Sequence, residues 1–141
     1  MKIGGVVGMM VLVDTSVWID FFSAADLPHV KTLENLILGR EDICVCGIIV
    51  TEILQGIRID SEFKRIKGLL DNLVVLSMPN SVFIRSAEIY RNLRKKGITI
   101  RKSVDCMIAA VAIEHNVPIL HNDRDFTSIE AHFGLKSLPC N

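Results

Sequence analysis

Short, uninterrupted apolar runs alternate with helix-like segments along most of this chain, and this alternation is its most constraining feature. Apolar runs of four to six residues bounded by charged or turn-forming residues are typical of strands buried on both faces of a parallel sheet. Strands joined by helices predict an α/β fold in which a central, mostly parallel sheet carries helices on both faces. The predicted strands, the last of them the weakest candidate, are Met9–Val13, Ile43–Cys46, Val74–Met78, Pro118–Leu120 and Leu135–Leu138.

The helices are predicted from apolar positions three or four residues apart and from residues that begin or end helices. Asn80 or Ser81 would cap the longest helix, and Gly97 would stop it. Thr127 and Glu130 have the spacing of a capping box. The helix from Ser103 is apolar around most of its circumference, which predicts a central position. The predicted helices are Ser16–Ser23, His29–Leu38, Ile48–Ile57, Ser61–Leu73, Asn80–Lys96, Ser103–His115 and Thr127–Phe133.

The chain has 141 residues, half of them hydrophobic, which predicts one domain over residues 1–141 with residues 1–9 as an extension before the first strand. Its formal net charge of zero excludes a generic binder of polyanions, so any contact with nucleic acid must come from a local patch. Six basic residues and no acid lie between Arg91 and Lys102. They either complement the end of a helix or contact phosphate. The candidate phosphate contacts are Arg94, Lys95, Lys96, Arg101 and Lys102.

The four cysteines fit no common zinc-binding spacing, and Cys44 and Cys46 lie in an apolar run. We interpret all four as reduced, small hydrophobic residues, which favours a reducing compartment and a cytoplasmic protein. No apolar run approaches the length of a membrane-spanning helix. Lys2 and the apolar run after it resemble a weak signal peptide, but Asp14 and Asp20 interrupt the segment.

Four acidic residues occupy positions that favour a metal site. Asp14 directly follows the first predicted strand and Asp123 follows the fourth, and ligands of parallel sheets bind beyond the carboxyl ends of the strands. Glu52 and Asp105 lie on apolar helix faces, where a lone carboxylate is costly. If these carboxylates converge, each pair near 4 Å repels by about 4 kcal/mol at a dielectric near 20. Such a cluster requires counter-ions, and oxygen ligands suit Mg²⁺ or Mn²⁺.

Most of these acids also have a purely structural explanation. Asp14 could cap the helix that follows it, and Asp123 could cap a turn. Asp105 in a first helical turn would favour the helix dipole, with Ser103 as the better cap. The position of Glu52 excludes a capping role. The prediction of a metal site therefore rests on the four acids together.

Four ordered motifs surround these acids: Val11–Ile19 (VLVDTSVWI), Thr51–Gly56 (TEILQG), Asp105–Ala110 (DCMIAA) and Leu120–Phe126 (LHNDRDF). In order and spacing they resemble those of PIN-domain ribonucleases, most closely the VapC-type toxins of bacterial and archaeal toxin–antitoxin pairs. The resemblance covers residues 10–138. The chain departs from the family pattern at its start, because nine residues precede the first strand and Met10 resembles the more typical first residue.

The resemblance implies a PIN-like three-layer fold and a metal-dependent endoribonuclease, the toxin of a type II toxin–antitoxin pair. It implies that Asp14, Glu52 and Asp105 are catalytic metal ligands and that Asp123 completes the quartet, with Asp125 as the less favoured fourth acid. Thr15 or Ser16 would supply a supporting hydroxyl, and we favour Ser16. The implied cofactor is Mg²⁺ or Mn²⁺. The implied partners are an RNA substrate, a second copy of the chain and a small antitoxin whose tail occludes the site.

Two other functions compete with this prediction. Haloacid-dehalogenase-like phosphatases also begin with an apolar strand and an Asp, but they require a second Asp two residues later, where this chain has Ser16. A non-catalytic PIN-like module that binds nucleic acid would have lost its metal ligands, whereas all four acids are present. The sequence does not encode the RNA target.

Overall fold

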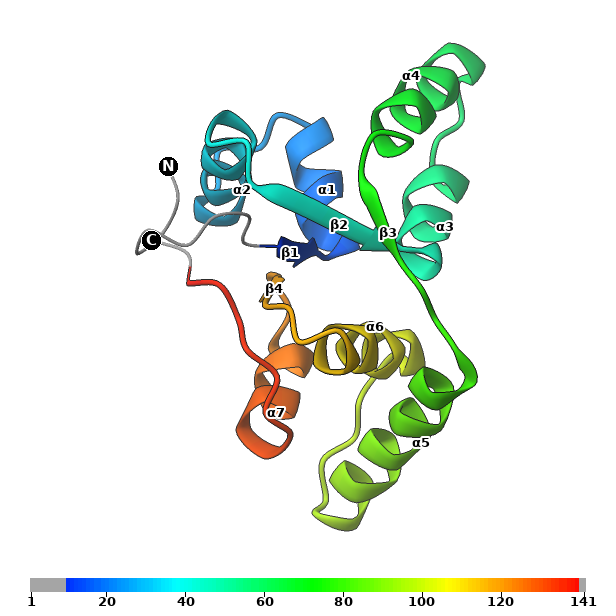
Figure 1. Ribbon diagram of the computed structural model, residues 1–141, viewed down its shortest axis with the longest axis vertical. Helices are drawn as coiled ribbons and strands as arrows, with labels where there is room; N and C mark the ends of the chain where they lie inside the picture. Colours follow the sequence, from blue (N-terminus) through cyan, green and yellow to red (C-terminus); the bar gives the residue numbers. More distant parts are fainter. Residues whose placement is uncertain (1–9, 140–141) are drawn as a thin grey trace.

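The structure is a computed structural model that describes residues 10–139. Its described residues form one sheet of four strands in the order β3-β2-β1-β4, and every pair of neighbours is parallel (Figure 1). Leu12 lies in register with Cys44 on one side and with Ile119 on the other. The predicted parallel sheet is confirmed. Its strands are β1 (Met10–Val13), β2 (Asp42–Cys46), β3 (Val74–Leu76) and β4 (Ile119–Leu120).

Helices lie on both sides of this sheet, α1 and α2 on one side and α5, α6 and α7 on the other in the view of Figure 1. The α/β architecture with helices on both faces is therefore confirmed. Each helix overlaps a predicted one. Their bounds are α1 (Thr15–Phe22), α2 (Pro28–Leu38), α3 (Gly47–Gln55), α4 (Asp60–Leu70), α5 (Asn80–Lys95), α6 (Ser103–Glu114) and α7 (Arg124–His132).

Several predicted elements are shorter in the structure, most clearly β3 and the last predicted strand. β3 ends at Leu76, ahead of Pro79, which has no N–H to continue a ladder. The predicted last strand at Leu135–Leu138 is reduced to a single parallel bridge between Ser137 and Ile119. The predicted extension over residues 1–9 lies outside the described residues, and the described part begins at Met10.

The predicted cap of α7 was wrong. Asp123 is the N-cap, and its carboxylate accepts a hydrogen bond from the backbone N of Asp125 at 2.9 Å. The helix therefore begins at Arg124, and Thr127 lies inside it and cannot form the predicted capping box with Glu130. The observed N-cap, Asp123, lies four residues before the predicted one, Thr127, and its carboxylate satisfies a first-turn donor.

The caps of α5 and α6 also differ from prediction. Pro79 precedes α5 in an extended conformation, and its carbonyl accepts from the backbone N of Val82, so Asn80 and Ser81 already lie in the first turn. Lys102 is the N-cap of α6, and its carbonyl accepts from Asp105 N, so Ser103 is the first helical residue. Neither helix has a side-chain cap.

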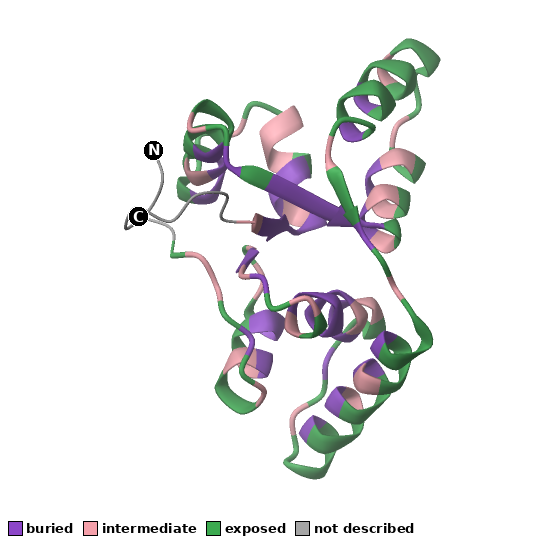
Figure 2. Ribbon diagram, in the orientation of Figure 1, coloured by how far each residue is buried: buried purple, intermediate pink, exposed green. Residues whose placement is uncertain are grey.

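The helix α6 is as central as its apolar sequence predicted. Seven of its residues are buried, and it packs against α5, α7 and α3 (Figure 2). Cys44, Cys46 and Cys106 are buried free thiols, while Cys140 lies outside the described residues. Among the described helices, none combines the length and the apolar character that crossing a membrane requires.

Candidate metal centre

Asp14 lies between the end of β1 and the start of α1, where it is the N-cap of the helix. Its Oδ2 accepts hydrogen bonds from the backbone N of Ser16 at 3.2 Å and from the Ser16 hydroxyl at 2.7 Å. The capping role that the sequence allowed is therefore real. Burial raises the pKa of Asp14, although the hydrogen bonds from Ser16 oppose that rise, and the nearby charge of Glu52 adds to it.

Glu52 lies in the second turn of α3 and is half-buried. Its Oε1 accepts a hydrogen bond from the hydroxyl of Thr15 at 2.7 Å. The two hydroxyls considered from the sequence thus have separate partners: Thr15 orients Glu52, and Ser16 orients Asp14. The pKa of the Cys46 thiol is raised, mainly through burial and further through the charges of Asp14 and Glu52.

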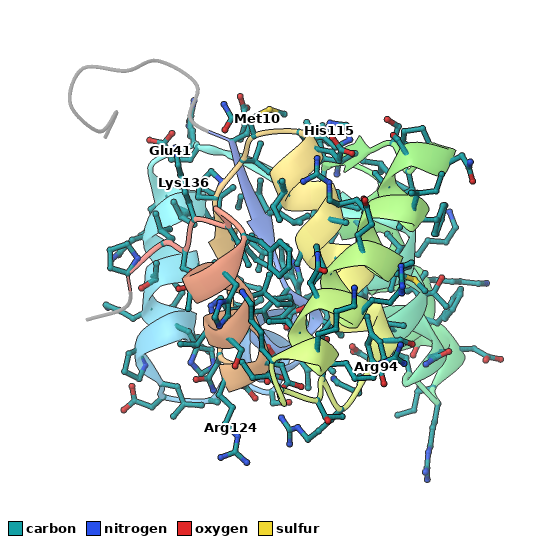
Figure 3. All side chains as sticks on the ribbon, turned by 90° about the horizontal axis from the view of Figure 1, so that it is seen from below. Met10, Glu41, Arg94, His115, Arg124 and Lys136 are labelled. Atoms are coloured by element: carbon teal, nitrogen blue, oxygen red, sulfur yellow. The ribbon has the colours of Figure 1, made fainter. Side chains whose placement is uncertain are left out.

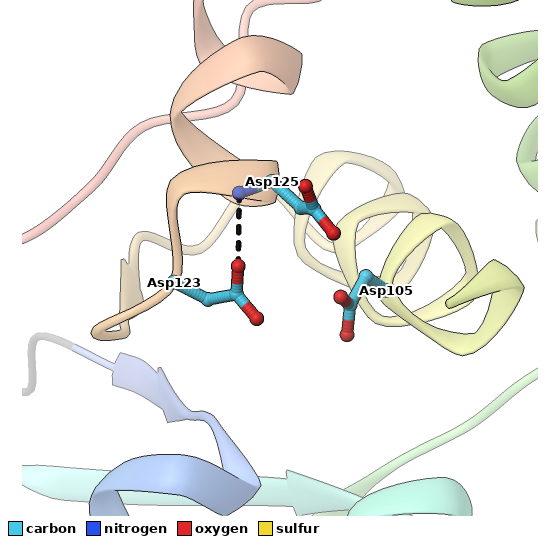
Figure 4. A group of neighbouring side chains, drawn as sticks. All are labelled: Asp105, Asp123 and Asp125. Carbon is cyan, nitrogen blue, oxygen red and sulfur yellow. Dashed lines mark hydrogen bonds between the residues drawn. The ribbon is translucent and has the colours of Figure 1, made fainter. Parts of the chain in front are cut away.

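Asp105, Asp123 and Asp125 form a compact group in which one ligand atom from each lies within 4.8 Å of the others (Figure 4). Asp105 comes from the first turn of α6, and the other two come from the start of α7. Asp14 and Glu52 lie outside this compact group. The group is nevertheless coupled to Asp14 by charge, because Asp14 contributes to the pKa of Asp105.

Asp105 shows most clearly that the negative charge of this group is only partly compensated. It is 2% exposed, and its buried Oδ2 has no hydrogen-bond partner among the described residues. Burial raises the pKa of Asp105 to about 7. Lys102 opposes the rise, and the charges of Asp123, Asp14 and Asp125 add to it. An ionised Asp105 therefore needs compensation that the protein groups around it only partly supply.

Asp125 is more prominent in the structure than in the sequence analysis. It is buried at 7% exposure, whereas Asp123 is half-buried. The family resemblance favoured Asp123 as the fourth acid and ranked Asp125 below it, and the last helix was expected to begin only at Thr127. An earlier helix start would have placed it in the first turn, where an acid is favoured.

Two residues of the basic stretch contact these acids. Arg101 places Nη2 at 3.2 Å from Asp123 Oδ1 and Nε at 3.4 Å from Asp125 Oδ2. Lys102 Nζ lies 3.9 Å from Asp105 Oδ1. The ion pairs of Arg101 join distant parts of the chain, whereas the pair of Lys102 with Asp105 is local. The run of basic residues in the sequence predicted neither.

The other three basic candidates lie at the end of α5. Arg94 and Lys95 are in its last turn, and the Arg94 guanidinium lies 5.7 Å from the ring centre of Tyr90. Lys96 Nζ lies 3.2 Å from the ring of His132. Basic residues at this end complement the helix dipole, so the structural explanation applies to Arg94 and Lys95, and contact with RNA stays a prediction.

His121 supports the turn between β4 and α7. Its Nδ1 accepts a hydrogen bond from the backbone N of Asp123 at 3.1 Å, and its Nε2 lies 2.7 Å from Glu130 Oε1 and 2.9 Å from Ser137 Oγ. Its ring packs against Phe126. Glu130 therefore contacts His121 and takes no part in the capping box that the sequence predicted.

The donor set fits a hard divalent cation. Its atoms are carboxylate oxygens, the ligands that Mg²⁺ and Mn²⁺ favour. The unpartnered Oδ2 of Asp105 is a buried acceptor without a proton donor. Asp105, Asp123 and Asp125 are brought together, and Arg101 and Lys102 are the cations paired with them among the described residues. This excess of negative charge is what a divalent cation would neutralise.

Known proteins resemble this chain in sequence and in fold. A sequence model of the PIN domain matches residues 11–131. Ribonuclease VapC11 of Mycobacterium tuberculosis is 36% identical over 122 residues, which cover 85% of this chain and 91% of that protein. A crystal structure of VapBC2 from Rickettsia felis bound to promoter DNA has a TM-score of 0.74 at 20% identity, covering 94% of this chain and 100% of the matched chain. VapBC-1 of Haemophilus influenzae has a TM-score of 0.71 at 20% identity, with coverage of 92% and 97%. At this identity the structural likeness demonstrates a shared fold.

Proposed function

The chain belongs to the PIN-domain family, and from this premise we propose that it is an endoribonuclease that acts as the toxin of a type II toxin–antitoxin pair. Its relative VapC11 is named a ribonuclease, and solved proteins of the same fold are VapBC complexes. The observation that carries the proposal is the compact group of Asp105, Asp123 and Asp125, with a buried, unpartnered carboxylate oxygen on Asp105.

Asp14, Glu52, Asp105 and Asp123 would hold Mg²⁺ or Mn²⁺, with Asp125 beside Asp123. When bound, the ion supplies an activated water nucleophile and positive charge opposite the phosphodiester. The chain contributes orientation: Ser16 fixes the carboxylate of Asp14, and the Thr15 hydroxyl fixes that of Glu52. Fixed carboxylates matter because phosphoryl chemistry depends chiefly on positioning and electrostatics.

The RNA would lie across the carboxyl edge of the sheet. The segment 96–102 connects the end of α5, which carries Arg94 and Lys95, to the start of α6, which carries Asp105. Basic side chains beside an acidic metal centre would hold the RNA backbone through its phosphates. Because the net charge of the chain is zero, RNA would be attracted by a local group of basic residues and not by the charge of the protein as a whole.

The protein partners would use apolar surfaces. A groove between α1, α3 and α4 is lined by apolar residues such as Ile19, Phe22 and Ile57, and Glu52 lies at its wall. An antitoxin segment in this groove would also cover the catalytic acids. Exposed Phe83 and Ile84 on α5 provide apolar surface for a homodimer. Reduced buried cysteines are compatible with the proposed cytoplasmic location.

The two competing functions make different use of the site. In a haloacid-dehalogenase-like phosphatase, the position of Ser16 would carry an acid, whereas here the Ser16 hydroxyl donates to Asp14. A non-catalytic binding module would have no need for the compact group of Asp105, Asp123 and Asp125, whose mutual repulsion destabilises the protein without an ion.

Cleavage of total cellular RNA by the purified protein tests the proposal. We expect internal cleavage in Mn²⁺ or Mg²⁺ that stops in EDTA, and no release of phosphate from p-nitrophenyl phosphate. Phosphate release without RNA cleavage would instead identify a phosphatase. RNA binding that persists without any cleavage in either metal would identify a binding module.

A further inference from the structure

Arg101 joins two acids of the candidate metal centre through one guanidinium. Its Nη2 contacts Asp123 and its Nε contacts Asp125, at 3.2 and 3.4 Å. These are two of the three carboxylates that form the compact group with Asp105. A single positive charge thus pairs with two of the carboxylates that a divalent ion would neutralise, and the two cations would repel each other there.

The two sides of this ion pair differ in their freedom to move. The Arg101 side chain is 59% exposed, whereas those of Asp123 and Asp125 are 15% and 10% exposed. The acids are held by the start of α7, but the guanidinium lies at the surface, where ion pairs are weak and screened by salt. The guanidinium can therefore leave while the carboxylates stay.

The backbone of Arg101 is attached separately from its side chain. Its N–H donates to Asp125 Oδ2 at 3.3 Å. This hydrogen bond keeps the backbone of Arg101 beside the acids when the guanidinium moves. A released guanidinium at this place has the planar fork that fits a phosphate, and RNA is the proposed substrate.

Lys102 does not duplicate this role. Its Nζ lies 3.9 Å from Asp105 Oδ1, and it contacts one acid of the group. Arg101 is thus the cation that bridges two of the acids among the described residues.

We propose that Arg101 is a displaceable counter-ion: it neutralises Asp123 and Asp125 before the divalent ion binds and then transfers its guanidinium to a phosphate of the RNA. This inference rests on the proposed metal-dependent ribonuclease function. It predicts that Arg101 opposes metal binding and supports RNA binding, two effects of opposite sign from one side chain.

Arg101→Gln tests the first effect by calorimetric titration of the full-length protein with Mn²⁺ at low salt. We expect Mn²⁺ to bind roughly three- to tenfold more tightly than to the wild type, because a competing surface cation is removed. Arg101→Lys, which retains a charge but loses the fork, should lie between the two.

The matched control is Arg124→Gln, which removes the same charge from the residue between Asp123 and Asp125. Arg124 is exposed, points away from the body of the protein in Figure 3, and has no ion pair with any residue in the described range. We expect its Mn²⁺ affinity to change by less than about twofold, because an exposed, distant charge is screened. Equal tightening in both variants would attribute the effect to general electrostatics and overturn the proposal.

The second effect is measured as the salt dependence of RNA binding, by fluorescence anisotropy in EDTA and in Ca²⁺. In Ca²⁺, Arg101→Gln should reduce the slope by about 0.7, the value for one phosphate contact on a single strand. In EDTA the slopes should agree, because the acids retain the guanidinium.

Unchanged or weaker Mn²⁺ binding, or equal slopes in both conditions, would contradict the proposal. If the wild type binds Mn²⁺ but Arg101→Gln does not tighten it, only this inference fails; if the wild type binds no Mn²⁺, the proposed metal centre fails as well.

Discussion

Asp105→Asn should abolish Mn²⁺ binding and at the same time stabilise the metal-free protein at pH 8. The buried Oδ2 of Asp105 has no described hydrogen-bond partner, and its carboxylate faces the charges of Asp123, Asp14 and Asp125. Asn has nearly the same size but no charge. It removes the repulsion and the cost of burying an ion, and it removes the charge that attracts the metal.

The pH dependence of this stabilisation follows from the raised pKa of Asp105, which is about 7 in the folded protein. The unfolded chain loses the same proton near pH 4. Between these values the folded state binds more protons than the unfolded state, so this group makes the wild type less stable as the pH rises. The penalty is complete above pH 7 and corresponds to roughly 2–4 kcal/mol. The Asp105→Asn variant would carry no such penalty at any pH.

Urea unfolding in EDTA at pH 5.5 and pH 8 measures the effect, and calorimetry with Mn²⁺ measures the loss of binding. The stabilisation by Asp105→Asn should be larger at pH 8 by about 1–2 kcal/mol. Asp71→Asn is a matched control, because Asp71 pairs with Lys67 at the exposed end of α4. It should change stability by less than about 0.5 kcal/mol. A variant with wild-type Mn²⁺ affinity would remove Asp105 from the metal centre.

Asp14→Asn should abolish RNA cleavage while the protein remains folded. Asp14 is the N-cap of α1 and accepts two hydrogen bonds from Ser16. Asn is as good a cap as Asp, so the substitution keeps the structural role and removes the charge. We expect the cleavage rate to fall by at least about a hundredfold, since even outer partners of metal ligands are worth about 10–100-fold.

Cleavage of cellular RNA in Mg²⁺, thermal unfolding, and growth arrest upon expression are the three measurements for Asp14→Asn. Asp26→Asn is the control, because Asp26 is an exposed acid shortly after the same helix. It should cleave RNA at the wild-type rate. A folded Asp14→Asn protein that also did so would reduce Asp14 to a helix cap.

The sheet and the central helix were predictable because their signals are local. The apolar run of β1 and the apolar circumference of α6 each require burial on most sides, whatever the rest of the chain does. The start of α7 was not predictable in this way. Asp123 and Thr127 are both good caps, and the choice between them depends on the turn that His121 supports through Glu130 and Ser137.

The candidate acids could be chosen from the sequence, but their contacts could not. Asp14, Glu52, Asp105 and Asp123 stood out because a carboxylate after a buried strand or on an apolar helix face needs an explanation. The pairing of Arg101 with Asp123 and Asp125 joins residues more than twenty positions apart. No periodicity or local preference encodes such a pair, because it exists only once α6 and α7 are packed together.

Anomalous scattering from crystals that contain Mn²⁺ would locate the ion in the protein. We expect a peak bound by Oδ2 of Asp105 together with carboxylate oxygens of Asp14 and of Asp123 or Asp125. Metal–oxygen distances should be about 2.0–2.3 Å. A crystal saturated with Mn²⁺ that shows no peak among these acids would show that they do not form a metal centre.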